Sequence, residues 1–342
     1  LWSVITVFLM FAAFALTGKA VARRWHFNAE PIDPALPWKI AALSALLMAD
    51  KLHQIFTLGQ SDGLMLLGFA LVLHWLDRKP VLAGIAAGAA ANIKYLSLIF
   101  VPYFLFKRNF RAAFSACVSF AFFLALPMVS TGITRGLDYA LVALGGIGRI
   151  LGRPAPNIRI IEVTWDHSVS VTSTMLRATR ALHSPDSVAL VLILLIFGAL
   201  LAGIVFLSRR ARVPLFGVSQ VNDETVAPAI RTLEWAILVV LADIFSPQAT
   251  PRHLVLIALV YSVALAIFFT ARESRFRKIV AAALALMVFG LCFPSRGTPL
   301  DFVMKHWRSI GGPSWCAIVL VLVLTFAGSR VIAARSSQRK EP

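Results

Sequence analysis

The chain has 342 residues, of which 59% are hydrophobic and 14% charged, and its mean hydropathy is +0.80. These values exclude an ordinary water-soluble domain and indicate a membrane protein. A formal net charge of +17 would suggest a nucleic-acid partner in a soluble protein. In a membrane protein, however, lysine and arginine gather in the cytoplasmic loops and so indicate the topology. We therefore expect no nucleic-acid partner. The three cysteines have no CxxC spacing, and neither a disulfide framework nor a metal site is expected.

Apolar runs recur along the whole chain. Because a bilayer core of about 30 Å needs about 20 helical residues, we predict eleven membrane segments in one integral membrane domain over residues 1–342. The fold class is therefore all-α, a polytopic transmembrane helical bundle. The predicted segments are 1–22, 36–50, 56–76, 111–130, 188–208, 230–246, 253–271, 279–293 and 315–334, with two short helices inside 81–106.

The stretch 81–106 is predicted to be a helical hairpin. As one helix it would place Lys94 near the bilayer centre, where an unpaired cation is costly. Basic pairs stand at both of its ends, Arg78–Lys79 and Lys107–Arg108. Because short cytoplasmic loops carry the excess of lysine and arginine, both ends belong on the inner side, and Lys94 belongs at the opposite surface.

The same rule orients the rest of the chain. The other basic clusters fall on the same side as these pairs, which predicts a multi-pass protein of the cell membrane with a cytoplasmic C-terminus. Residues 131–187 then form an outer-face loop, and amphipathic stretches such as 137–151 suit helices lying in the membrane interface. The chain opens with Leu1-Trp2-Ser3 in mid-helix and without methionine, so we expect it to be truncated at its N-terminus.

Sequence motifs of several soluble enzyme classes are missing. The sequence has no Walker A loop, Rossmann glycine turn, HExxH motif or GxSxG elbow in the required context. Gly84 and Gly88 form a GxxxG pattern, which we interpret as close helix packing without chemistry.

Two polar clusters lie at the predicted outer ends of the early helices. The first contains Gln60, Ser61 and Asp62 and opens an apolar helix. Ser61 or Asp62 could simply cap free N–H groups there, or the cluster could bind a ligand. The second is Lys94, which could either reach lipid headgroups or offer its charge to a phosphate.

Two further clusters lie on the same predicted face. One contains Asp166 and Ser168, with Arg177 placed so that a helix would bring its guanidinium beside Ser168. Two readings stay open for it, a phosphate site and an ordinary amphipathic loop with capping side chains.

The fourth cluster spans Asp243–Gln248, which includes Ser246, and continues to Arg252 and His253. It could be a ligand site or a plain turn in which prolines break one helix and the chain restarts another. Together the four clusters supply carboxylates and cations to one face. Sugar transfer requires a carboxylate to take a proton and cations to stabilise a phosphate leaving group.

At the level of these motifs the chain resembles glycosyltransferase family 87, a GT-C type group of polytopic enzymes. The resemblance runs from Gly59 to about Pro127. It rests on Gly59-Gln60-Ser61-Asp62, on Ala83-Gly84 through Ile93-Lys94, and on the basic loop Lys107–Arg111. Later matches are Asp166-His167-Ser168 with Arg177, and Ser246-Pro247 with His253.

The sequence departs from the family pattern in three places. Asp62 and Asp166 stand where asparagine is commoner, and Tyr95-Leu96-Ser97 replaces a run that often contains proline. Enzymes of this type also resemble one another in an essential aspartate in the first outer loop. That loop is expected upstream of Leu1, so the resemblance gives no catalytic residue in this chain.

The resemblance implies transfer of a sugar, most often mannose, from a polyprenyl-phosphate donor to a glycolipid or polysaccharide acceptor on the outer face. It implies no cofactor or metal. The candidate phosphate-binding residues are Lys94, Arg177 and Arg252. Gln60, Asp62 and His253 are candidates for contacts with the sugar, and Asp166, Ser168 and Ser246 complete the predicted substrate-binding set.

Two other functions also fit a chain with many membrane helices. A transporter or lipid flippase would use a broken helix pair and intramembrane polar groups, but it predicts an internal repeat, and none is visible in the sequence. A non-catalytic membrane subunit is the other alternative.

Overall fold

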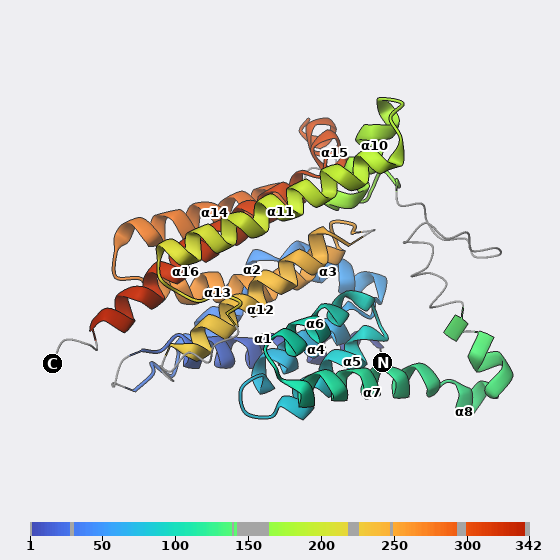
Figure 1. The fold of residues 1–342 in the computed structure, drawn as a ribbon, viewed down its shortest axis with the longest axis horizontal. Coiled ribbons are helices and arrows are strands. Elements are labelled where there is room, and N and C mark those ends of the chain that lie inside the picture. The colour runs from blue at the N-terminus through green and yellow to red at the C-terminus, as the bar shows by residue number, and fades with distance from the viewer. Residues whose placement is uncertain are drawn as a thin grey trace.

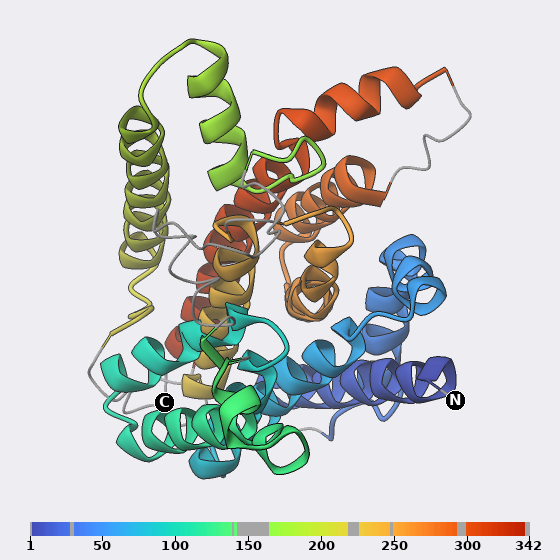
Figure 2. The ribbon, with the colours of Figure 1, turned by 90° about the vertical axis from the view of Figure 1, so that its right-hand side faces the viewer.

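The computed structural model describes residues 2–27, 31–138, 140–141, 164–217, 226–246, 249–292 and 299–338. Within these ranges the chain is helical and has no β-strand, which confirms the predicted all-α class. Figures 1 and 2 show the helices packed as one bundle, with α10 and α15 together at one end of it. The N-terminal helices are α1 (Trp2–Arg24), α2 (Leu36–Leu47), α3 (Ala49–Leu58), α4 (Asp62–Trp75), α5 (Pro80–Ala91), η1 (Tyr95–Ile99), α6 (Phe100–Phe106), α7 (Phe110–Ala125) and α8 (Met128–Thr131). The later helices are α10 (Val171–Ala181), α11 (Asp186–Arg210), α12 (Ala227–Ile244), η2 (His253–Leu256), α13 (Ile257–Thr270), α14 (Ser274–Cys292), α15 (Asp301–Ser309) and α16 (Gly312–Gln338).

Five helical spans in the described residues are long and apolar enough to cross a membrane: Trp2–Arg24, Phe110–Thr131, Asp186–Arg210, His253–Thr270 and Gly312–Ser337. Several other apolar helices, α2, α4 and α5 among them, are shorter, so the predicted number of eleven membrane segments is not confirmed. The most lipid-like surface belongs to α11, which stands at the edge of the bundle in Figure 2. Its Leu190, Leu194 and Phe206 side chains are exposed, as expected for a helix that faces acyl chains.

Two predicted boundaries are displaced because the backbone breaks where the apolar pattern continues. The predicted segment 36–50 ends as α2 at Leu47, and the chain bends at Met48 before α3 starts. Gly59 then ends α3 in the left-handed conformation, with a φ of 61°, which glycine adopts without a steric penalty. The predicted helix 56–76 therefore begins at Asp62.

The stretch 81–106 forms two short helical pieces that reverse direction around Lys94. Before the hairpin, Asp77 forms an ion pair with Arg231 of α12, and after it Lys107 forms one with Glu234 of the same helix. Both ends of the hairpin therefore lie near the start of α12, as predicted. Lys94 lies instead close enough to Asp243, at the other end of α12, for its charge to act on that carboxylate.

Close packing of α5 on α7 explains the GxxxG pattern. A Cβ atom at Gly84 would collide with the Ala112 carbonyl, and one at Gly88 would collide with the Ala116 carbonyl. Ser119 of α7 donates to the Ile85 carbonyl at 2.9 Å. The small residues therefore let two backbones approach, as the packing interpretation requires.

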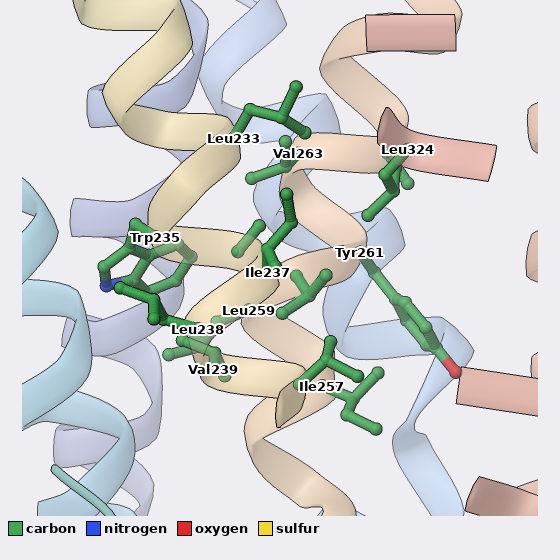
Figure 3. Close-up of a cluster of buried hydrophobic side chains, with 14 of the residues drawn as sticks. Leu233, Trp235, Ile237, Leu238, Val239, Ile257, Leu259, Tyr261, Val263 and Leu324 are labelled. Carbon is green, nitrogen blue, oxygen red and sulfur yellow. The ribbon is translucent and has the colours of Figure 1, made fainter. Parts of the chain in front are cut away.

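Helices α12 and α13 form the centre of the bundle. α12 touches α1 and η1 on one side and α16 on the other, and α13 touches both α2 and α14. Figure 3 shows their shared core, in which Ile237 and Val239 of α12 face Ile257 and Leu259 of α13. This pair joins the N-terminal helices to the C-terminal ones.

Candidate functional site

The first cluster places a buried carboxylate at the start of α4. The turn at Gly59 is held by the Trp2 indole, which donates to the Gly59 carbonyl at 2.8 Å. Gln60 is half-buried, and its N–H donates to the Ile55 carbonyl. Asp62 is 2% exposed. Ser61 occupies the N-cap position but makes no side-chain capping bond, so the simple capping reading does not describe this turn.

Lys94 reaches this carboxylate from the hairpin. Its backbone is extended at the N-cap of η1, and its ammonium donates to Asp62 Oδ1 in a close ion pair. The end of α5 is fixed by Asn92, whose amide donates to the Gly88 carbonyl at 3.0 Å and to the Phe120 carbonyl at 3.1 Å. The Lys94 side chain remains 27% exposed, so the cation is held in place but is still accessible.

The fourth cluster adds a second carboxylate and two basic groups. Asp243, in the last turn of α12, is fully buried, and the charges of Lys94 and Asp62 act on it. The charges of the same two residues and of Arg252 act on His253. The His253 N–H donates to the Thr250 carbonyl at 2.8 Å, and Nδ1 accepts from the Thr250 N–H at 3.4 Å. These bonds hold the imidazole at the start of η2.

Clusters one, two and four therefore converge on one site at neighbouring ends of four elements. We call it the charged site and define it by its five ionisable side chains: Asp62 from α4, Lys94 before η1, Asp243 from α12, and Arg252 and His253 at η2. Helix packing supports the grouping, because η2 contacts both α4 and α12 and η1 contacts α12. Ser246 lies next to this site, half-buried, and its N–H donates to the Asp243 carbonyl.

The third cluster braces the turn that carries Thr250 and Arg252. The Val169 N–H donates to the Ala249 carbonyl at 2.6 Å. Ser168 is buried, and its Oγ accepts from the Ala249 N–H at 3.2 Å and from the Ser173 hydroxyl at 2.8 Å. The Thr172 hydroxyl donates to the Phe245 carbonyl at 3.1 Å. Residues 168–169 and α10 are thus hydrogen-bonded to Phe245 after α12 and to Ala249 before η2.

Arg177 ties the same loop to α15. Its Nη1 donates to the Trp165 carbonyl at 2.7 Å, and its Nη2 donates to the carbonyls of Ser168 at 2.9 Å and Ser309 at 2.6 Å. Nη2 also lies 3.3 Å from Thr174 Oγ1. Burial lowers the pKa of Arg177, while the Asp166 charge opposes that shift. The guanidinium is therefore a clamp between chain segments, and its contact with a phosphate stays a prediction.

Asp166 is the most exposed of the predicted site residues. Its side chain is 73% exposed and lies 2.6 Å from His167 Nδ1. That hydrogen bond lowers the pKa of Asp166. The Trp165 and His167 rings stack, with centroids 5.0 Å apart and planes inclined by 7°.

Sequence reasoning named the segment that contains Asp243 but gave that residue no role. The available signal was a carboxylate near the end of a long apolar helix, where an ionisable group is costly unless it has a function. Of the amphipathic helices predicted in 131–187, α10 lies within the described residues. Most of the predicted stretch 137–151 falls outside them.

The fold and this site define a polytopic helical membrane protein with a charged site at the ends of its central helices. Comparison with protein-family models matches residues 1–223 to Glycosyltransferase family 87. The match covers 223 of the 342 residues, and the chain belongs to this family of membrane glycosyltransferases. Comparisons with curated proteins and with solved structures found no match. Asp62 and Lys94 lie inside the matched range, whereas Asp243, Arg252 and His253 lie beyond it.

Proposed function

We propose that this protein transfers mannose from a polyprenyl-phosphate donor to a lipid-linked or polysaccharide acceptor. The reaction would take place at the outer face of the cell membrane, with the C-terminus in the cytoplasm. The observation that carries this proposal is the Asp62–Lys94 ion pair, which fixes a partly exposed cation inside the helical bundle. The charges of this pair and of Arg252 all act on His253. A lipid phosphate is the leaving group that such a cation would stabilise.

The depth of the charged site supports a substrate that comes from the bilayer. α4 has 14 residues and α5 has 12, so at about 1.5 Å per residue they are about 20 Å long. If the end of α4 at Trp75 and the end of α5 at Pro80 lie at the inner surface, the opposite ends of both helices stop about 10 Å short of the far side of a core of about 30 Å. Asp62 and Lys94 would then lie within the outer leaflet, where the phosphate of a polyprenyl lipid could reach them.

The residues of the site divide by charge into two roles. Lys94 and Arg252 would hold the phosphate. The Lys94 ammonium uses one of its three N–H donors in the hydrogen bond to Asp62, so two donors are left for the phosphate. Gln60, Asp62 and His253 would contact sugar hydroxyl groups or orient the catalytic base. We assign that base to no residue of 1–342.

The predicted residues of the third cluster remain part of the proposal. Arg177 would act chiefly by holding the outer loop in place, because its hydrogen bonds join three separate segments. Asp166, Ser168 and Ser246 remain proposed substrate contacts, Asp166 being the most accessible of the three.

The test is a transfer assay with the full-length protein in native membranes or nanodiscs. Polyprenyl-phosphate mannose, labelled in the sugar, is supplied together with a membrane lipid extract as acceptor. We expect label to appear in a glycolipid or polysaccharide product. Transfer from a different polyprenyl-phosphate sugar alone would remove mannose and keep the donor class. Transfer from a nucleotide sugar, or movement of the intact donor across vesicles without transfer, would overturn the proposal.

A further inference from the structure

The two fully buried carboxylates of α12 have opposite surroundings. Glu234 is 0% exposed and is saturated with donors: Oε1 accepts from Lys107 Nζ at 2.7 Å and from the Phe216 N–H at 2.5 Å, and Oε2 accepts from the Tyr103 hydroxyl at 2.8 Å. Asp243 is also 0% exposed, but among the described residues neither of its oxygens has a hydrogen-bond partner. One helix thus carries a satisfied carboxylate near its start and an unsatisfied one near its end.

Other unsatisfied groups lie with Asp243. Among the described residues, Asp62 Oδ2, Thr250 Oγ1 and Arg252 Nε are also buried and lack a hydrogen-bond partner. They come from α4 and from the turn before η2, which pack against each other. Buried polar groups are normally paired, so a local group without partners requires an explanation. Here both donors and acceptors are left over, which is what a ligand carrying hydroxyl groups would complement.

The position of Asp243 makes its lack of partners more costly. The buried apolar core of α12 and α13, part of which Figure 3 shows, continues past Asp243 to Ile244 and includes Leu254–Leu256 of η2. Asp243 lies about one helical turn beyond Val239, and His253 lies about one turn before Ile257. A negative charge at a helix C-terminus is repelled by the helix dipole. The nearby ammonium of Lys94 is already bound to Asp62, so the folded chain leaves this carboxylate without a direct partner.

We propose that Asp243 binds the hydroxyl groups of the transferred sugar. This inference rests on the proposed function and adds a substrate-binding residue beyond the range that matches the family. An ionised carboxylate is an acceptor only and can take one O–H donor on each oxygen. Two neighbouring hydroxyl groups of a pyranose provide such a pair of donors. Thr250 and Arg252 Nε supply further partners for the sugar oxygens, while Lys94 remains for the phosphate.

Because Asp243 is covered in this structure, binding requires a local movement. Lys94, whose charge acts on Asp243, has a side chain that is 27% exposed. A displacement of the Lys94 side chain would open a path to the carboxylate from this partly exposed side. We assign Asp243 to sugar binding and not to proton transfer. Loss of a binding residue raises KM, whereas loss of a proton-transfer residue lowers kcat.

The experiment compares Asp243→Asn with Glu234→Gln in the full-length protein. Each substitution removes one buried charge from α12 and preserves the shape of the side chain. Without substrate, Asp243→Asn should raise Tm because it removes an unsatisfied charge. Glu234→Gln should lower Tm because it removes the charge that pairs with Lys107 and replaces one of the two acceptor oxygens by an NH₂ group. With polyprenyl-phosphate mannose, the wild type should show a ligand-induced rise in Tm that Asp243→Asn largely loses. In the transfer assay, Asp243→Asn should raise KM for the donor by about tenfold or more, the range for a lost hydrogen bond to a charged group, with kcat changed by much less.

The outcomes separate this inference from the proposed function. If the wild type transfers mannose and Asp243→Asn retains its KM and its ligand-induced Tm shift, the inference fails and the proposed function stands. If Asp243→Asn abolishes kcat without changing KM, Asp243 takes part in proton transfer and the binding role is wrong. If the wild type neither binds nor transfers any polyprenyl-phosphate sugar, both proposals fall. A fall in Tm for Asp243→Asn would mean that the carboxylate stabilises the fold and is not held for a ligand.

Discussion

Lys94 and Asp62 are 32 positions apart in the chain, yet they form an ion pair between the start of α4 and the residue before η1. The pair stabilises a cation at a position within the helical bundle where an unpaired lysine would have a high free-energy cost. It also leaves Asp62 Oδ2 buried without a hydrogen-bond partner in the described part of the chain. The ion pair is therefore both a structural contact and the centre of the proposed phosphate site.

We expect Lys94→Ala to raise the donor KM by about tenfold or more, in line with a lost charge-assisted hydrogen bond. The measurement is the transfer assay at varied donor concentration. Because the substitution also leaves Asp62 buried and unpaired, the double variant Asp62→Asn with Lys94→Met serves to separate folding from function. It should regain thermal stability and keep the raised donor KM.

Lys305→Ala is the matched control for that prediction. Lys305 pairs with Asp301 at 3.0 Å on α15, and its side chain is 73% exposed, so its removal should change neither Tm nor the donor KM. An unchanged KM in Lys94→Ala would refute the phosphate role of Lys94.

Arg177 and Arg180 lie on the same helix and should differ sharply in their contribution to stability. Arg177→Ala breaks the hydrogen bonds that tie the Trp165–Ser168 loop to α15 and should destabilise the fold by about 3 kcal/mol. Arg180→Ala breaks the exposed ion pair with Asp186, and a pair of this kind is worth about 0 to 1 kcal/mol. Thermal unfolding in detergent measures both, and equal Tm shifts would show that the clamp is unimportant.

Arg177→Lys extends this test. A lysine keeps the charge but lacks the planar fork that serves several carbonyls at once, so it should recover little of the lost stability. Full recovery would mean that charge, and not geometry, accounts for the effect of Arg177.

The α5–α7 contact should reject any side chain larger than hydrogen at its glycines. In Gly88→Ala the added Cβ would meet the backbone of α7, so the helices must separate, and we expect a loss of about 2 kcal/mol from the strain of overpacking. Gly198→Ala on α11 is the control, because no atom lies within 4 Å of its added Cβ. Retention of the wild-type Tm by Gly88→Ala would contradict this view of the interface.

The hairpin predicts the sidedness of three lysines. In a background without native cysteines, single cysteines at Lys79 and Lys107 should react with a membrane-impermeant maleimide from the cytoplasmic side. A cysteine at Lys305 should react from the outside, because α15 is linked to the outer loop through Arg177. Labelling of Lys79 and Lys107 from opposite sides would rule out the hairpin.

The sequence by itself determined the membrane class, most apolar segments, the hairpin and the approximate place of the polar clusters. These features follow from local composition, because the length of an apolar segment, the basic residues that flank it and the spacing of its small residues can all be read from neighbouring positions in the chain. The positions of Gln60, Asp62, Lys94 and His253 as candidates also came from such local breaks in the apolar pattern. The number of membrane segments could not be determined in this way, because the length of a short apolar run does not show whether its helix crosses the whole bilayer.

Only the tertiary structure decided which of these residues act together. Side-chain pairing depends on how helices distant in sequence pack, so the sequence could not assign Asp62 to Lys94 or show that Arg177 binds backbone carbonyls. It also could not distinguish Glu234 from Asp243, two acidic residues of one apolar helix. Their difference arises because neighbouring segments supply donors to Glu234 and, among the described residues, none to Asp243.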